Sequence, residues 1–152
     1  MSRRDQIRMT GQEVDEFLGG RRNMSVATIG HDGRIHMVAM WYGFIDDACA
    51  FWTYGKSQKI ANLRRNPAIT CLVEDGEEYS QLRGVELVGR GVVLEDRESV
   101  MAVGASVFER YTGPLDEQSR AALEVVGAKR VAVRIDVERT VSWDHGKLGG
   151  RY

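Results

Sequence analysis

The order of the expected secondary-structure elements constrains the fold of this chain more than any single motif does. After a helical pattern at 10–18, strand-like runs at 24–29, 35–44 and 48–53 precede a short helix. Two further strands, at 69–73 and 80–94, and two helices, at 96–111 and 117–126, lead to a last strand at 131–137. This is not the strict alternation of strand and helix that builds a parallel sheet. We predict a mainly β (α+β) fold, a small antiparallel barrel with helices packed outside.

Length and charge limit the kind of protein this is. With 152 residues and no linker or repeat, it is expected to be one domain over 1–152, with a helical arm at the start and a tail from 142 to 152. A net charge of -1 gives no reason to expect nucleic acid or an anionic membrane as a partner. No run could span a bilayer and no secretory signal opens the chain, so we expect a cytoplasmic location. Cys49 and Cys71, inside strand-like runs, are then buried reduced thiols.

The strand expected at 35–44 is apolar on both faces. A strand with one face in water alternates apolar and polar residues, and this one does not. It should therefore lie between the core and a second surface, which is either a subunit interface or a flat ligand.

The segment from Phe51 to Pro67 carries the clearest chemical signal. A strand ends at Tyr54-Gly55, and a short helix follows with Ser57 as its N-cap. No acidic residue occurs between positions 48 and 73, whereas four basic ones do: Lys56, Lys59, Arg64 and Arg65. A helix N-terminus with free amides, a hydroxyl and two nearby ammonium groups can bind an anion such as the phosphate of a cofactor. The alternative is a solvated basic helix that keeps the protein soluble.

This segment resembles the pyridoxamine-phosphate-oxidase-like split-barrel family of flavin and deazaflavin proteins. The matching residues in the segment are Thr53, Ser57, Lys59, Asn62, Leu63, Asn66 and Pro67. Further matches follow in order along nearly the whole chain: 25–29 with 32–34, the glycine-containing strand at 82–90, and 142–145.

The resemblance implies a split β-barrel of the FMN-binding type, acting as a homodimer with two cofactor sites at the subunit interface. Ser57 and Lys59 would then hold the cofactor phosphate, with Asn62 and Arg65 close by. Thr53, Tyr54, Gly55 and Lys56 would shape the loop over it. The strand lying along the flat ring system would contribute His36, Met37, Val38, Ala39, Met40 and Trp41.

Within the family, the F420-dependent reductases of actinobacteria give the better match. His36 stands where FMN-dependent members commonly carry a phosphate-binding arginine, and Trp41 stands where they carry a lysine. Ile35 and Ala39 replace common prolines, which alters the pocket wall. The long anionic tail of F420 could meet nearby basic residues: Lys56, Arg64, Arg65, Arg21 and Arg22.

We therefore expect an F420-dependent oxidoreductase that transfers a hydride between the deazaflavin and a small conjugated organic substrate. An FMN-dependent oxidase or reductase, or a non-catalytic protein that binds F420, haem or another tetrapyrrole, remains as an alternative. Haem would need His36 or His145 as its ligand. For the proton donor the candidates are Tyr42 and His36, and no metal-binding set is present. The segment 142–145 would either fray or cross to the partner subunit and wall its site.

Overall fold

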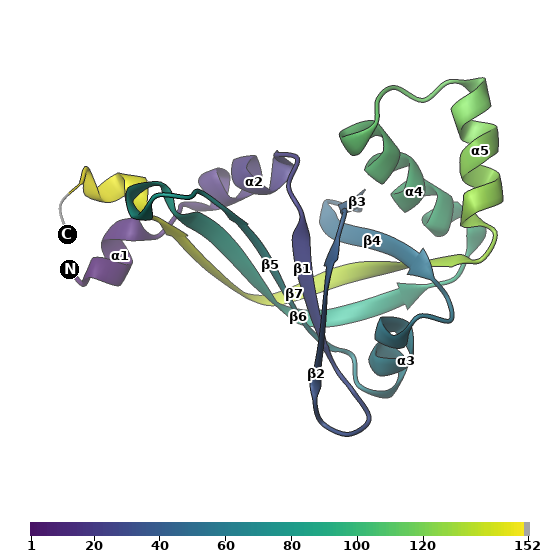
Figure 1. Cartoon of the computed structure of the whole chain (residues 1–152), viewed down its shortest axis with the longest axis horizontal. Coiled ribbons are helices and arrows are strands. Elements are labelled where there is room, and N and C mark those ends of the chain that lie inside the picture. The colour runs from purple at the N-terminus through teal and green to yellow at the C-terminus, as the bar shows by residue number, and fades with distance from the viewer. Residues whose placement is uncertain (151–152) are drawn as a thin grey trace.

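The computed structural model describes residues 1–150. Within these residues the chain forms seven strands, five α-helices and two short 3-10 helices (Figure 1). The strands are β1 (Met24–Ile29), β2 (Ile35–Met40), β3 (Gly43–Ile45), β4 (Ala48–Tyr54), β5 (Ala68–Asp75), β6 (Arg83–Leu94) and β7 (Arg130–Asp144). The helices are α1 (Arg3–Ile7), α2 (Gly11–Gly19), α3 (Gln58–Arg65), α4 (Arg97–Tyr111), α5 (Glu117–Gly127), η1 (Tyr79–Gln81) and η2 (His145–Leu148).

All seven strands form one antiparallel sheet in the order β2-β1-β5-β6-β7-β4-β3. Strands β2 and β3 are therefore its two edges, yet only Trp41 and Tyr42 join them in the chain. Because two residues span only a few ångströms, the sheet must curl until its edges nearly meet. The result is the split antiparallel barrel with outer helices that the sequence predicts.

The expected strand at 35–44 is in fact two strands, broken at the seam where the edges meet. Backbone groups there bond to side chains of α4 instead of to another strand. The N–H of Tyr42 donates to the hydroxyl of Tyr111 (3.4 Å), and Nε of Arg110 donates to the carbonyl of Tyr42 (2.9 Å). The N–H of Phe44 donates to Oγ of Ser106 (2.9 Å). Helix α4 thus satisfies the polar groups that the break exposes.

The structure also corrects the ends of two strands. Helix η1 occupies the start of the strand predicted at 80–94, which begins only at Arg83. The last strand does not stop at 137 but runs to Asp144, and Trp143 pairs with Gly84 of β6. The first part of the predicted tail at 142–152 is therefore a sheet strand of its own chain and does not fray. Residues 151–152 of that tail lie outside the described residues.

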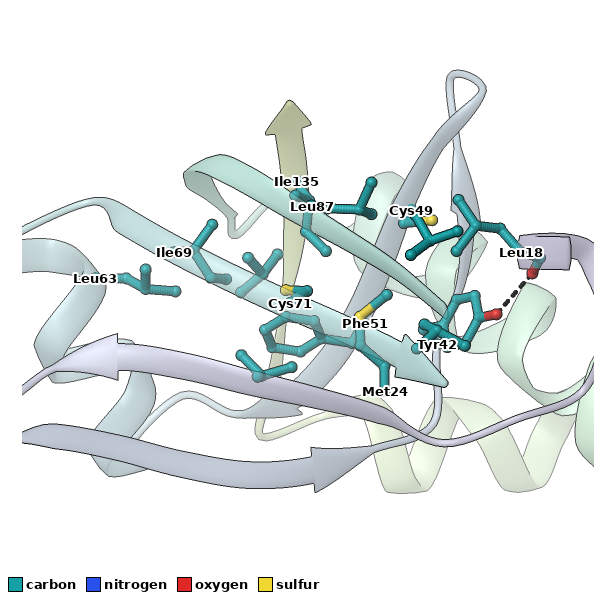
Figure 2. Packing of buried hydrophobic residues seen from close by; sticks show 14 of the residues in the cluster. Leu18, Met24, Tyr42, Cys49, Phe51, Leu63, Ile69, Cys71, Leu87 and Ile135 are labelled. Carbon is teal, nitrogen blue, oxygen red and sulfur yellow. Dashed lines mark hydrogen bonds between the residues drawn. The ribbon is translucent and has the colours of Figure 1, made fainter. Parts of the chain in front are cut away.

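Two hydrophobic clusters lie on opposite faces of β4. Alternate residues of the strand belong to different clusters: Phe51 packs inside the barrel with Met24 and Tyr42 (Figure 2). Trp52 packs against α4 and α5 with Val103. The five inner positions of β4 are all buried, because both faces of the strand are covered. This explains why its sequence does not alternate between apolar and polar residues.

One further prediction concerns the core. Cys49 and Cys71 are buried free thiols, as expected, and burial raises the pKa of Cys49 to about 11. The long strand β6 contains an irregularity at a glycine, since its register against β7 shifts between Val88 and Gly89. Among residues 1–150, no helix is long and apolar enough to cross a membrane.

Candidate anion and cofactor site

The end of β4 and the start of α3 form a tight turn. The N–H of Gly55 donates to the carbonyl of Lys129 (3.0 Å), and the N–H of Ser57 donates to the carbonyl of Tyr54 (3.0 Å). These bonds fix the N-terminus of α3 against the start of β7 (Figure 1). The first N–H groups with an intrahelical acceptor are those of Ile60 and Ala61. The preceding amides of the helix are left for solvent or a ligand.

Ser57 occupies the N-cap position, as predicted, but its side chain does not cap the helix. Its Oγ is buried and has no hydrogen-bond partner among the described residues. A buried hydroxyl without a partner carries a desolvation cost that a bound acceptor would remove. The Ser57 hydroxyl is therefore free to donate to a ligand at this helix terminus.

Lys59 is a buried cation without a counter-ion. Its side chain is 8% exposed, and Nζ donates to Oγ1 of Thr53 at 3.0 Å. It forms no ion pair with any residue from 1 to 150. Burial, together with the nearby charge of Arg130, lowers the pKa of Lys59 below its ordinary value. An ammonium held in this way favours an anion beside it.

Arg130, which the sequence analysis did not predict, is the second cation of the site. Its guanidinium carbon lies 4.8 Å from the ring centroid of Trp52 and 4.6 Å from that of Tyr54. The two rings fix the guanidinium by cation–π contact. Nε of Arg130 is buried and, within the described chain, has no acceptor. The antiparallel register places Arg130 directly opposite Tyr54.

Lys59 and Arg130 are thus within electrostatic range of each other, and Lys59 follows closely on the free hydroxyl of Ser57 at a helix N-terminus. No carboxylate among residues 1–150 forms an ion pair with either cation. Like charges held together in a folded protein are unfavourable unless an anion completes the site. The prediction that Thr53, Ser57 and Lys59 come together is consistent with this geometry. The arrangement suits a phosphate better than a solvated basic face, because the charges of Lys59 and Arg130 are partly withdrawn from water.

Other basic and polar residues of the segment point elsewhere. Asn62 is fully buried and ties α3 to β1, since its Nδ2 donates to Oγ1 of Thr28 at 3.0 Å. Arg65 donates to the carbonyl of Ile29, and Arg64 pairs with Glu95. These three side chains hold the helix in place. Exposed Lys56 forms no ion pair in the described part of the chain.

A cavity of about 390 Å³ lies at the seam of the barrel, and one of the two cations, Arg130, lines it. Trp52 and Arg130 line one side, and residues from the end of β2 line the other. The lining residues are Asn23, Ala39, Met40, Trp41, Trp52, Val107 and Arg130. Of the six residues predicted from 36 to 41, three therefore line this cavity.

The other three residues of that stretch are arranged differently. Met37 is 67% exposed on the outer face of β2, and His36 and Val38 are half-buried on its inner face. His36 pairs with Thr28 of β1, and its Nδ1 is buried without a hydrogen-bond partner among the described residues. A larger cavity, of about 610 Å³, lies between the N-terminal arm and β7 and contains none of the predicted site residues.

Tyr42 is wrong as a candidate proton donor. Its side chain is fully buried, its hydroxyl donates to the carbonyl of Leu18 (2.6 Å; Figure 2), and burial raises its pKa to about 12. Because this phenol is buried and weakly acidic, Tyr42 stabilises the barrel core and does not serve as a proton donor.

Comparison with known proteins gives a consistent result. The sequence model of the pyridoxamine 5'-phosphate oxidase family matches residues 10–144. A conserved hypothetical protein from Mycobacterium tuberculosis is 43% identical with a TM-score of 0.94, over 100% of this chain and 95% of that chain. A protein described as an F420 reductase is 25% identical with a TM-score of 0.66, over 83% of this chain and 94% of that one.

The haem storage protein of Vibrio cholerae has a TM-score of 0.69 at 16% identity, over 90% and 97% of the two chains, and this likeness shows the fold alone. No curated protein matches the chain.

Proposed function

Because the chain belongs to the pyridoxamine 5'-phosphate oxidase family, we propose that its site binds coenzyme F420 and that the protein is an F420-dependent oxidoreductase. The observation that carries the proposal is the buried ammonium of Lys59, without a counter-ion among residues 1–150, together with the half-buried Arg130 and the free hydroxyl of Ser57. These donors suit the phosphate group of the cofactor. The adjoining cavity at Trp41 and Trp52 suits a flat ring system.

An FMN-dependent reaction is the second candidate. The protein belongs to a family named for an oxidase that acts on a phosphate compound, and FMN also carries a phosphate. F420 is favoured by the likeness to the protein described as an F420 reductase and by His36 in place of a second phosphate-binding arginine. Of the basic residues expected to meet the anionic tail, Lys56 has no ion-pair partner within residues 1–150. Haem has less support, because neither His36 nor His145 lines the cavity at the seam.

When bound, reduced F420 supplies a hydride to an electron-poor conjugated substrate. The residues of the chain bind and orient it: Lys59 and Arg130 hold the phosphate, while Trp41 and Trp52 exclude water from the ring site. His36, the other predicted candidate for supplying a proton, does not line this cavity, so the proton is expected to come from solvent. Turnover tests the proposal: reduced F420 should be oxidised by the protein with a conjugated acceptor. Retention of that activity after Arg130→Gln would contradict the role of the site.

We also propose that a second copy of the chain covers the outer face of β2. Ile35 and Met37 are 71% and 67% exposed, which is unusual for large apolar side chains in adjacent outward positions. The neighbouring strands β1 and β5 continue the outer face of β2, with mostly small or apolar residues in the paired outward positions. Its residues, the outer strip, are Ile35, Met37, Ala39, Ala27, Ile29, Thr70 and Leu72. An apolar edge strand of this kind invites pairing with an identical surface.

Substitution of Met37 by glutamate tests the dimer. The charge would lie in the middle of the outer strip, so the protein should change from dimer to monomer in light scattering coupled to size exclusion. Val125→Glu is the matched control, since Val125 is 78% exposed on α5, away from this face. A monomeric native protein, or a Met37→Glu variant that stays dimeric, would contradict the proposal.

The lowered pKa of Lys59 makes cofactor affinity depend on pH. An anion beside the ammonium favours its protonated form, so affinity should fall as the pH rises through the lowered pKa, before the ordinary value of 10.5 is reached. The free energy of unfolding of the unliganded protein should rise over the same pH range, because the folded state favours the neutral amine of Lys59. Affinity measured from about pH 7 to about pH 10 should decline more for the native protein than for Lys59→Arg. Parallel profiles would show that Lys59 does not touch the anion.

A further inference from the structure

Trp41 and Tyr111 form an aromatic platform at the seam of the barrel. Their rings are stacked, with centroids 4.7 Å apart and planes 7° from parallel. The hydroxyl of Tyr111 donates to the carbonyl of Arg22 at 2.5 Å, and this hydrogen bond fixes the Tyr111 ring of the stack. Trp41 is nevertheless 52% exposed. A large ring held in place by a partner on one side and open to solvent is pre-organised to stack a second planar group.

The surroundings of the platform are cationic. A cavity of about 300 Å³ is lined by Arg21, Arg22, Asn23, Trp41 and Tyr111, with no carboxylate among them. The charge of Arg22 is offset, because its guanidinium pairs with Asp75 at 3.1 Å and lies over the ring of Phe17. Arg21 is exposed, and no ion pair reaches it from any of residues 1–150. One uncompensated cation therefore stands at the edge of the platform.

We propose that this platform is the substrate subsite and that it takes a small planar aromatic carboxylate. The aromatic ring stacks on Trp41, and the carboxylate meets the guanidinium of Arg21. A cavity of this volume accommodates one or two fused rings. The assignment of the platform to the substrate rests on the proposed function, because it assumes that the cofactor ring occupies the cavity beside Arg130. Trp41 and Asn23 also line the cavity beside Arg130, so the substrate would lie next to the cofactor ring.

Calorimetric titration with 2-naphthoate, in the absence of any cofactor, tests the subsite directly. The neutral analogue 2-naphthylmethanol serves as the comparison ligand. We expect naphthoate to bind more tightly than the alcohol, Trp41→Ala to weaken both by about tenfold, and Arg21→Gln to weaken naphthoate alone by about fivefold. Arg34→Gln is the matched control, because the Arg34 side chain is 90% exposed in the β1–β2 turn, at the opposite end of β2 from Trp41. It should leave both affinities unchanged.

Equal affinities of the native protein and Trp41→Ala for naphthoate would overturn the proposal, as would an equal effect of Arg21→Gln and Arg34→Gln. Unchanged thermal unfolding of each variant shows that a lost affinity is not lost folding. Because no cofactor is present, failure of this experiment leaves F420 binding untouched, and failure of F420 binding leaves the naphthoate result standing.

Discussion

Arg130→Gln should weaken cofactor binding by about ten- to a hundredfold. The guanidinium is fixed between two aromatic rings and has a buried N–H without an acceptor, so its charge-assisted contact with a phosphate costs little ordering. Loss of such a contact removes about 1.5–3 kcal/mol of binding free energy. The change is measured as the dissociation constant for F420 by fluorescence titration. Arg64→Gln, a control on α3 whose charge is already paired with Glu95, should bind as the native protein does.

Lys59→Met separates a binding role from a structural one. The substitution keeps the length of the side chain but removes a buried charge that the fold tolerates at a cost, as the lowered pKa of Lys59 shows. Cofactor affinity should fall as for Arg130→Gln, while the midpoint of thermal unfolding of the unliganded protein should stay the same or rise. A variant that unfolds at lower temperature and binds normally would mean that Lys59 serves the fold alone.

Gly89→Ala should produce the largest loss of stability among single methyl additions. A Cβ at this position would lie 2.0 Å from the carbonyl oxygen of Asp136, which is backbone and is held in the β6–β7 ladder. Because real Cβ atoms do not approach backbone this closely, the bulge must shift and the ladder must distort. We expect a loss of about 3 kcal/mol, which would lower the midpoint of thermal unfolding by about 6–12 °C.

Gly19→Ala is the control for this comparison, since a Cβ there meets nothing within 4 Å. It should change the stability by no more than about 1 kcal/mol. Similar midpoints for the two variants would show that the close approach at Gly89 is relieved without disturbing the sheet.

Local patterns in the sequence predicted the secondary structure around the proposed anion site correctly. The strand, the turn at Tyr54-Gly55 and the helix that begins after Ser57 follow one another in a short segment. Propensity and capping rules act over such distances, so Ser57 and Lys59 were placed at one helix terminus without knowledge of the fold. The absent capping bond of Ser57 could not be predicted, because it depends on the rotamer that the surroundings allow.

The remaining features depend on contacts between distant parts of the chain. Arg130 enters the site because β7 pairs with β4 in a register that brings it opposite Tyr54. Trp41 is exposed at a seam because Arg110 and Ser106 of α4 take over backbone hydrogen bonds that a continuous strand would have made. The strand boundary at Asp144 likewise depends on pairing with β6. Long-range register of this kind leaves no periodic signal in either strand alone.

Titration of the purified protein with F420 and, separately, with FMN tests the central claim most directly. Fluorescence or anisotropy would follow each binding curve for the native protein and for Arg130→Gln. We expect micromolar or tighter binding of F420 and weaker binding of FMN by the native protein, and loss of affinity for both in the variant. Binding of neither cofactor by the native protein, or binding unaffected by Arg130→Gln, would contradict it.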